Sequence, residues 1–519
     1  MDTDTRSCVW KGIGSGLKTV SEERKREKPV RPVSLRPGNL PARIIALVLI
    51  ICLGLTVPDA QELHAGTADY RSVLPKLETS IKKLDIDYYV RDVEAENNWE
   101  GVTNISYVGE KNGNALFAVD FGDLIAVYEC LKEEATGVDK EGTEVREVFA
   151  SDPICIMKEN PLFGGVICDG EGFLYVVTGT VGDASSQLPG YVYVTKYSPE
   201  GDMIGQVIDD GASSLGIEAG TEYLNLEPFN NGNCVLEINN GVLAVYYARK
   251  MISGHQSDSL FLVNTDTLEE VVVGRVYQSH SFAQRAVPYG KGFLLVSEGD
   301  CYDRAFVVTK VNNKFNTKSS AVFHFGVKPG TLDNVDMAAL NNNFAHLGDI
   351  AMLGNGRAVL AATSARSMKE KAEKEAEDIF IQIFSPKKDL TTKKAYVGGK
   401  KRKGLSGGNG DTSCTDYGVR WITKLKKNEK ISSLHCVVTE DDTIVLLYEK
   451  QNEDGHFEGV FYTLLDKNGD VIVEEMPFWN RARLPRGESP VCTGNRIWWI
   501  GNALEDYCLC VYTLVINPA

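Results

Sequence analysis

The sequence lacks the short motifs that would name a reaction or a bound metal. A P-loop, the His-Glu-x-x-His zinc motif and a full calcium loop are absent. None of the twelve cysteines forms a Cys-x-x-Cys pair, which removes support for a zinc ribbon or a thioredoxin-type site. The stretch DKNGD (466–470) resembles part of a calcium loop, but Asn468-Gly469 between two apolar runs is typical of a hairpin turn. We therefore expect no metal and no cofactor, and whether the protein is an enzyme stays open.

Long apolar runs are also scarce. The one sustained run is IIALVLIICLGLTV (44–57), which is shorter than the ~20 residues that cross a bilayer comfortably. Basic residues precede it and small residues follow it, which favours a secretory signal or signal-anchor segment, with a buried core element as the alternative. We expect an extracellular or cell-surface protein that contacts the membrane only through this segment. Residues 1–43 are then a flexible basic tail and 58–84 a linker.

Positive charge is in short supply over most of the chain. Lys and Arg number 55 against 71 Asp and Glu, so the formal net charge is −16. Residues 1–43 hold ten basic and five acidic residues, a charge of +5, which leaves −21 for the rest. A surface this acidic repels phosphate backbones, so we expect no nucleic-acid partner. Most cysteines beyond the apolar run are expected to be core thiols, although an oxidising compartment leaves disulfides possible.

What the sequence has in abundance is one repeated pattern. A short strand, a turn of Gly, Asn or Asp, and an apolar strand recur seven times, and such turns supply the positive φ of a β-hairpin. The seven copies are GEKNGNALFAV (109–119), CDGEGFLYVV (168–177), EINNGVLAVYY (237–247), PYGKGFLLV (288–296), MLGNGRAVLAA (352–362), TEDDTIVLLY (439–448) and CTGNRIWWI (492–500). The pattern predicts an all-β chain built from hairpins.

Each hairpin is followed by another apolar strand and, in six copies, by a polar turn and a fourth strand. Seven units of four strands predict a seven-bladed β-propeller over residues 85–519. Eight blades are the alternative, because residues 399–438 have room for a further hairpin. The last copy ends before its fourth strand, so we expect an N-terminal strand to close the ring, with DIDYYV (85–90) as the candidate.

Two insertions interrupt the repeat. RSMKEKAEKEAED (366–378) is prone to form a helix but has no apolar stripe, so a solvated excursion is favoured over a partner-binding helix. Residues 398–413 are rich in glycine and contain four consecutive basic residues, Lys400 to Lys403. A flexible loop is favoured there, and contact with an anionic polymer or headgroup is the alternative.

The fourth repeat carries the densest charge. His280, Gln284 and Arg285 lie at one end of its hairpin, and Asp300, Asp303 and Arg304 lie at the other. Strand ends of a propeller converge near the axis, so these side chains are a candidate ligand site for a carboxylate or for sugar hydroxyls. The alternative is a structural network that joins one blade to the next.

The same segment resembles a known group of proteins. SHSFAQR followed by GFLLVSEGDCYDRAFVV, within residues 279–308, is similar to a segment of uncharacterised secreted bacterial propeller proteins. In these, a His-Ser-Phe-x-Gln-Arg run precedes a Gly-Asp-x-Tyr-x-Arg run. The resemblance implies the propeller fold, and it implies no activity.

Two functions are compatible with such a propeller. The first is a binding or scaffold module that recognises a glycan or an extracellular protein. The second is a carbohydrate-active enzyme, a hydrolase or lyase, that works in the axial funnel. Clustered acids with a His or Tyr near the axis would favour the enzyme, whereas backbone and aromatic rings would favour binding.

Overall fold

A computed structural model describes the chain from residue 75 onward, with gaps. The described residues are 75–87, 104–138, 144–215, 220–230, 232–299, 304–325, 345–366, 376–403, 415–485, 487–502 and 508–517. The chain divides into two compact units, Met1–Asp69 and Tyr70–Ala519. The predicted tail and the apolar run 44–57 lie in the first unit, outside the described residues. Within the described residues, no helix is long and apolar enough to cross a bilayer.

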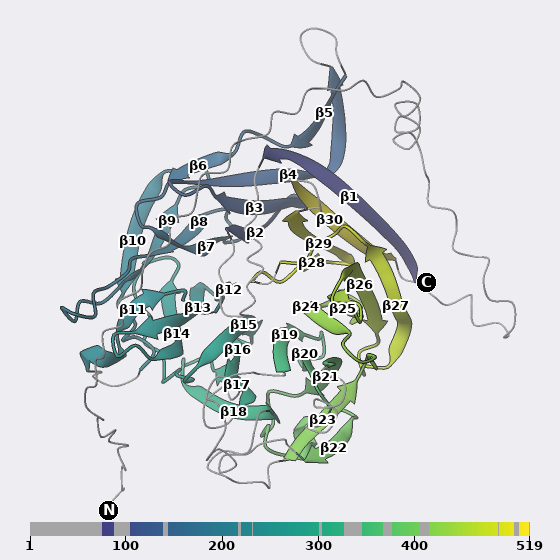
Figure 1. Ribbon diagram of the computed structural model, residues 1–519. Helices are drawn as coiled ribbons and strands as arrows, with labels where there is room; N and C mark the ends of the chain where they lie inside the picture. Colours follow the sequence, from purple (N-terminus) through teal and green to yellow (C-terminus); the bar gives the residue numbers. More distant parts are fainter. Residues whose placement is uncertain are drawn as a thin grey trace, which may run out of the picture. The chain divides into compact units, whose positions relative to one another are not determined.

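Tyr70–Ala519 forms a seven-bladed β-propeller, as the repeats predict (Figure 1). The first three blades contain β2 (Ile105–Lys111), β3 (Asn114–Asp120), β4 (Leu124–Val138), β5 (Glu144–Phe149) and β6 (Ile154–Met157); β7 (Leu162–Cys168), β8 (Leu174–Gly179), β9 (Val192–Tyr197) and β10 (Met203–Asp209); and β11 (Asn225–Pro228), β12 (Cys234–Asn239), β13 (Val242–Met251) and β14 (Gln256–Asn264).

The other four blades complete the ring. They contain β15 (Ser281–Tyr289), β16 (Gly292–Gly299), β17 (Ala305–Val311) and β18 (Thr317–His324); β19 (Ala345–Met352), β20 (Ala358–Ser364), β21 (Asp378–Phe384), β22 (Lys400–Lys403) and β23 (Thr415–Trp421); β24 (Lys430–Val438), β25 (Ile444–Gln451), β26 (Phe457–Leu465) and β27 (Val471–Trp479); and β28 (Val491–Thr493), β29 (Arg496–Asn502), β30 (Cys508–Asn517) and β1 (Lys76–Asp87). Two short 3-10 helices, η2 (Thr221–Tyr223) and η3 (Lys393–Ala395), lie in connections.

All seven predicted hairpins are present, each as two adjacent antiparallel strands of one blade. Their turns use the expected residues. Asn112 and Gly113 have φ of 54° and 81°, and Asn240 and Gly241 have φ of 51° and 75°. Two successive positive φ values match the twist of the flanking strands, which explains why Asn-Gly occurs here.

The ring is closed by a strand from the N-terminal side, as predicted, but the strand lies further upstream. β1 begins at Lys76, within the stretch predicted as a linker, and shares only Asp85–Asp87 with the expected segment 85–90; residues 88–90 lie outside the described part. β1 pairs antiparallel with β30. The sequence pattern did not reveal this strand. An outermost strand is exposed on one face and so carries charged residues such as Lys76 and Glu78, which interrupt the apolar pattern.

The predicted alternative of an eighth blade is wrong for the described residues. β22 and β23 do form a further hairpin, but β23 pairs with β21 and so extends blade five. The basic run at 400–403, expected to be loop, is therefore a strand. The helix expected at 366–378 stays a prediction, because residues 367–375 lie outside the described part.

Blade three departs from the four-strand pattern on its outer side. Beyond β14 the chain makes only isolated bridges, Val263 with Glu270 and Ser257 with Ser279. The intervening backbone instead bonds to neighbouring connections: Gly274 N donates to Phe315 O and Val276 N to Ser214 O. The extra strand of this sheet is β11, which pairs with the far end of β13.

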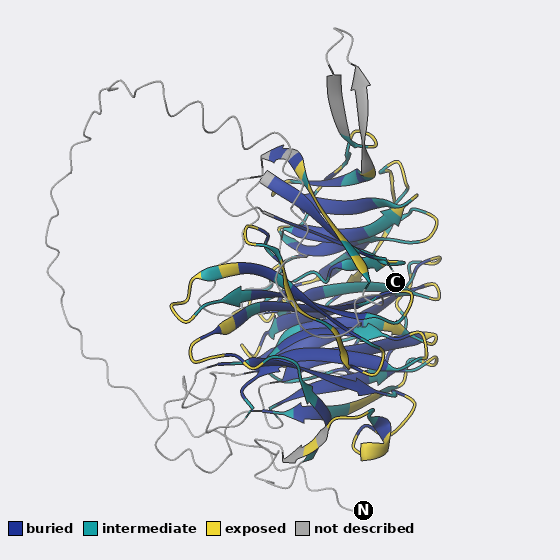
Figure 2. Cartoon of the chain, turned by 90° about the vertical axis from the view of Figure 1, so that its right-hand side faces the viewer, coloured by how far each residue is buried: buried dark blue, intermediate teal, exposed yellow. Residues whose placement is uncertain are grey.

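Apolar side chains fill each interface between neighbouring blades. One cluster joins blades one and two, others join each successive pair, and the largest joins blades six, seven and one. The largest cluster contains Trp498 and Trp499 of β29, both fully buried. Figure 2 shows the buried strands stacked in the interior, with exposure confined mainly to turns and outer edges. The core is thus a ring of interfaces around an axis.

The inner strands approach one another so closely that several positions require glycine. A Cβ at Gly164 would lie 2.7 Å from the Phe229 ring, and one at Gly348 would lie 2.7 Å from Leu434. Both glycines fall at register shifts, in β7 and β19. A β-bulge bends its strand and re-aims the next side chains. Crowding at the axis therefore selects glycine at both positions, and at Gly348 the next residue is the buried Asp349.

The Leu84→Ala substitution tests ring closure by β1. Leu84 is 0% exposed within the largest apolar cluster, so we expect the free energy of unfolding to fall by about 2–5 kcal/mol. The exposed Ser80 of the same strand provides the control, and Ser80→Ala should change stability by no more than about 0.5 kcal/mol. Equal unfolding midpoints in denaturant for the two variants would show that β1 does not close the ring.

Candidate functional site: an axial network and a groove between blades

Polar contacts run almost completely around the axis of the ring. They are formed by the inner strands β2, β7, β15, β19 and β24 and by residues that precede β12 and β28. The contacts are Ser106 Oγ to Val166 O (3.0 Å), Asn233 N to Gln284 Oε1 (2.8 Å), Arg285 Nε to Asp349 Oδ1 (3.6 Å), His435 Nδ1 to Asp349 Oδ2 (3.2 Å), His435 Nε2 to Pro485 O (2.5 Å) and Tyr107 N to Glu488 Oε2 (3.4 Å). Between blades two and three the contact is steric: a Cβ at Gly165 would lie 3.0 Å from Leu236.

The connection from β27 to β28 crosses this axial region. Pro485 O accepts a hydrogen bond from blade six, and Glu488 accepts one from blade one. Gly487 O accepts one from Asn233 Nδ2 of blade three at 3.4 Å. One short segment therefore contacts three blades that are not sequential neighbours, and it adds a carboxyl group to the axis.

The structure separates the predicted site residues into two groups. Gln284 and Arg285 belong to the axial network: Gln284 is fully buried, and Arg285 is 4% exposed and donates through Nη1 to Gln284 O at 2.9 Å. This is the arrangement expected of a network that joins blades. Asp300 and Asp303 lie outside the described residues. Whether any of these groups binds a ligand stays a prediction.

His280 and Arg304 form the second group, at the ends of β15 and β17. The His280 ring lies 4.5 Å from the ring of His255, and His255 Nε2 is 2.7 Å from Ser279 Oγ. Burial lowers the pKa of His280, and the nearby His255 and Arg304 lower it further. His280 also has a φ of 53°, which is uncommon for a residue other than glycine.

Sequence reasoning missed most of the axial network. Asp349 and His435 are buried polar residues in the inner strands β19 and β24, and Glu488 comes from an irregular connection. Both strands contain further polar residues, so their sequences do not single out Asp349 and His435. Nothing in the sequence around Glu488 indicates that its segment turns inward.

Two axial carboxyl groups hold their protons unusually tightly. Burial raises the pKa of Glu237 in β12 to about 8, and the negative charges of Asp349 and Glu488 raise it further. Burial also raises the pKa of Glu488 to about 7, against the opposing effects of the Tyr107 amide, Arg285 and Ser106. Glu237 keeps some contact with solvent, but protein surrounds it on all sides, so its charged form is poorly hydrated.

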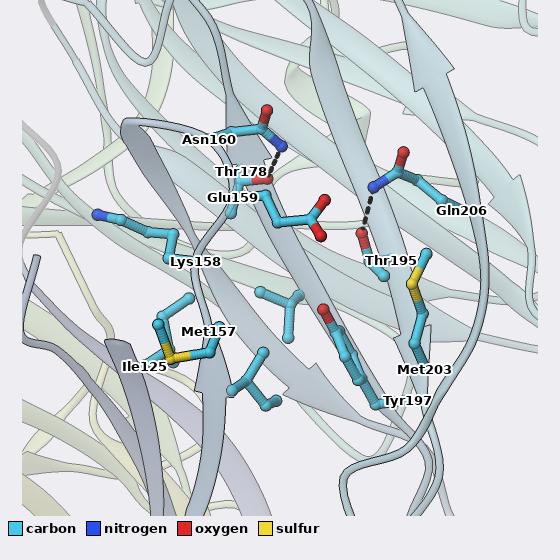
Figure 3. A pocket seen from close by; sticks show the side chains of 12 residues that line it. Ile125, Met157, Lys158, Glu159, Asn160, Thr178, Thr195, Tyr197, Met203 and Gln206 are labelled. Carbon is cyan, nitrogen blue, oxygen red and sulfur yellow. Dashed lines mark hydrogen bonds between the residues drawn. The ribbon is translucent and has the colours of Figure 1, made fainter. Parts of the chain in front are cut away.

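A second candidate site is a groove between blades one and two (Figure 3). The groove is shallow, and the roughly 310 Å³ of space that it outlines is largely open solvent. It is lined by Ile125, Ile156, Met157, Lys158, Glu159, Asn160, Val176, Thr178, Thr195, Tyr197, Met203 and Gln206. Ile125, Ile156 and Val176 belong to the apolar core shared by the two blades, whereas Met157 and Met203 are exposed. Among the polar members, Glu159 and Gln206 are exposed, and Thr178 and Thr195 are buried.

Two amide–hydroxyl pairs dominate the polar lining. Asn160 Nδ2 donates to Thr178 Oγ1 at 3.0 Å, and Gln206 Nε2 donates to Thr195 Oγ1 at 2.8 Å. Figure 3 shows the two pairs on opposite sides of the groove, with Glu159 between them and Tyr197 below. Thr178 and Thr195 stand on adjacent strands of blade two, whereas Asn160 belongs to the connection from blade one. The Asn160–Thr178 pair therefore depends on how this connection packs on blade two, whereas the Gln206–Thr195 pair lies within blade two, on β10 and β9.

The connection that carries Glu159 and Asn160 is held in place by Lys158. Its backbone N donates to Asp123 O at 2.9 Å, and its Nζ lies 2.7 Å from Asp120 Oδ2. The side chains of Lys158 and Asp120 are only 5% and 9% exposed. A buried pair of this kind fixes the backbone locally, because moving either partner would leave a charge without compensation.

No group of three or more His, Cys, Asp or Glu side chains within the described residues is arranged to hold a metal ion. Two of the described thiols, Cys168 and Cys492, are poorly suited to nucleophilic chemistry. Burial raises the pKa of Cys168 to about 11 and that of Cys492 to about 12. Reactive cysteines have pKa values lowered by nearby positive charge instead.

The chain is only distantly similar to known proteins. No family model and no curated protein sequence matches this chain. Among solved structures, a protein of unknown function from Dyadobacter fermentans is similar with 11% identity and a TM-score of 0.38, over 86% of this chain and 100% of that one. A polysaccharide lyase of family PL25, an ulvan lyase, has 10% identity and a TM-score of 0.40, over 67% and 79% of the two chains. Trypanosoma rangeli sialidase has 12% identity and a TM-score of 0.33, over 68% and 53%. Likeness this distant assigns no activity.

Arg285→Ala tests the role of the axial network. The change removes the cation that faces Asp349 and Glu488, so we expect the free energy of unfolding to fall by about 3–5 kcal/mol. Arg481→Ala, on an exposed turn, is the matched control and should stay within about 0.5 kcal/mol of the parent. A change as small as the control's, together with loss of binding to a ligand, would instead favour a ligand site at Arg285.

The raised carboxyl pKa values predict that acid stabilises the fold. In the folded state Glu237 and Glu488 bind protons up to about pH 8 and pH 7, whereas unfolded glutamate releases them near pH 4.3. The folded state thus holds more protons in this window, so stability should rise as the pH falls from 8 toward 5. Melting temperatures across this range measure the effect. Glu237→Gln should flatten the profile and Glu440→Gln, at an exposed turn, should not; a profile that rises with pH would contradict the assignment.

Proposed function

We propose that this protein is an exported binding module that recognises a glycan in the groove between blades one and two. The observation that carries the proposal is the facing arrangement of the Asn160–Thr178 and Gln206–Thr195 pairs. Localisation at the cell surface or outside the cell is part of the proposal, and its support is the apolar run 44–57 after a basic tail.

The chemistry of the groove suits sugar hydroxyls. Each amide donates one N–H bond to a threonine, which leaves its second N–H as a donor and its carbonyl oxygen as an acceptor for ligand hydroxyls. The Tyr197 side chain adds an aromatic surface of the kind that packs against the apolar face of a pyranose ring. A few fixed polar groups on an apolar base are typical of small-molecule sites.

Binding is favoured over catalysis in this groove. Hydrolysis of a glycosidic bond normally uses two carboxyl groups that flank the bond. Glu159 is the one carboxylate among the lining residues, which all lie in the described part of the chain. The described lining thus lacks the second carboxyl that a hydrolase of the usual kind requires.

A carbohydrate-active enzyme that works at the axis is the second candidate. The observation that favours it is the pair Glu237 and Glu488, whose pKa values of about 8 and about 7 suit a general acid near neutral pH. His435 and Arg285 lie in the same network. The crossing segment at 485–488 contacts blades one, three and six there, which favours a structural role for these groups.

Gln206→Ala tests the groove. A glycan array first identifies a ligand, and titration calorimetry then measures its affinity. Loss of one ligand hydrogen bond of about 1.4 kcal/mol corresponds to a tenfold weaker affinity, and loss of the Gln206–Thr195 bond should lower the free energy of unfolding by no more than about 1.5 kcal/mol. Asn160→Ala should act similarly, and Asn313→Ala, on an exposed turn of blade four, should have no effect. Unchanged affinity in both groove variants, or no array binding at all, would refute the proposal.

A further inference from the structure

The polar groups that the groove offers to a ligand include several acceptors of hydrogen bonds. Each amide NH2 group donates one of its two N–H bonds, to Thr178 or to Thr195, so each amide keeps one N–H donor and its carbonyl oxygen. The carboxylate of Glu159 is exposed beside them. Since the amides can both donate and accept, it is the charge of Glu159 that decides which kind of ligand the groove favours.

The charge that projects into the groove is negative. Two charged residues line it, Lys158 and Glu159. The Lys158 ammonium is 2.7 Å from the Asp120 carboxylate, and both side chains are almost completely buried, so their charges compensate each other. Glu159 is exposed, and Figure 3 shows its carboxylate between the two amide–hydroxyl pairs. Its charge is therefore available to a ligand.

Tyr197 lies near Glu159 in the groove. Burial raises the pKa of the Tyr197 hydroxyl, and the negative charge of Glu159 raises it further. The tyrosine hydroxyl points toward Glu159 in Figure 3. A cation bound here would meet a carboxylate, a phenolic oxygen and two amide carbonyls. A primary ammonium, which carries three donors and no acceptor, has the complementary chemistry.

From this geometry we infer that the groove selects a glycan with free amino groups, such as an oligomer of glucosamine. The inference depends on the proposed function and specifies its ligand class. The ring hydroxyls of such a ligand would bond to the amide–hydroxyl pairs, and its ammonium would bond to Glu159. Uronic acids would be rejected, because their carboxylates would face that of Glu159 without an uncompensated cation among the described lining residues. The net charge of −16 favours the approach of a cationic ligand in the same way.

The experiment compares four tetrameric probes by titration calorimetry at pH 6 and low salt. The probes are tetramers of glucosamine, of N-acetylglucosamine, of galacturonic acid and of lysine. We expect the glucosamine tetramer to bind at least tenfold more tightly than the N-acetylated one, and the galacturonate tetramer to bind weakest. Lysine supplies ammonium groups without ring hydroxyls, so tighter binding of its tetramer than of glucosamine would overturn the glycan assignment.

Glu159→Gln identifies the source of the preference. The variant keeps the shape of the side chain and removes its charge, so the preference for glucosamine over N-acetylglucosamine should disappear while the N-acetylated probe still binds. Glu171→Gln, on an exposed turn of blade two, is the matched control and should retain the preference. A preference that survives Glu159→Gln, or parent protein that binds both sugars equally, would overturn the inference and leave the proposed function standing. If the parent binds none of the three sugars and no glycan on the array, the proposed function fails as well.

Discussion

The close approach of the inner strands around the axis is the constraint on which the rest of this structure depends. Seven sheets meet there with so little space that glycine occupies positions such as Gly164 and Gly348. The strands carry register shifts at these positions, and the buried Asp349 directly follows Gly348. A buried polar group is costly unless it is paired, and the ring solves this by pairing groups from successive blades. The ring can therefore close only in an arrangement that also pairs the polar groups at its centre.

That shared solution explains why the axis and the groove have different chemistry. At the axis, Asp349 contacts both Arg285 and His435, so its bonding capacity serves the ring itself. In the groove, the buried pair of Lys158 and Asp120 supports the backbone, and Glu159 beside it faces outward. The polar groups that join blades at the axis are thus bonded to one another. The Glu159 carboxylate, on a connection held by the Lys158–Asp120 pair, remains available. In this fold, a buried charged residue therefore indicates a functional site only after its bonding partners within the protein have been identified.

The architecture could be predicted from the sequence because its signal is repeated and local. Asn112-Gly113 and Asn240-Gly241 need no distant partner to specify a hairpin, and seven such turns in series imply the ring. The predicted closing strand lay downstream of most of β1. The charged residues of β1, such as Lys76 and Glu78, belong to its exposed outer face and hide the strand pattern, and its partner β30 lies at the other end of the chain. The site was harder to predict, because its residues are also distant from one another in the sequence. Gln284 and Arg285 were recognisable as an unusual polar pair, but Asp349, His435 and Glu488 join them only through the fold, as Asn160 joins Thr178 across two blades.

The pairing of β1 with β30 also sets an order of events during synthesis. The ribosome delivers β1 first among the strands of the ring and its partner β30 last. The entropic cost of joining distant segments grows only slowly with their separation, so the finished ring loses little by this arrangement. Folding to the closed ring is slow in comparison, because contacts between distant segments form late. Until the final strand emerges, blade seven has no sheet to which β1 can add, and the exposed edge of β1 is open to pairing with other chains. The strand that seals the propeller is therefore also the one that most needs protection while the protein is being made.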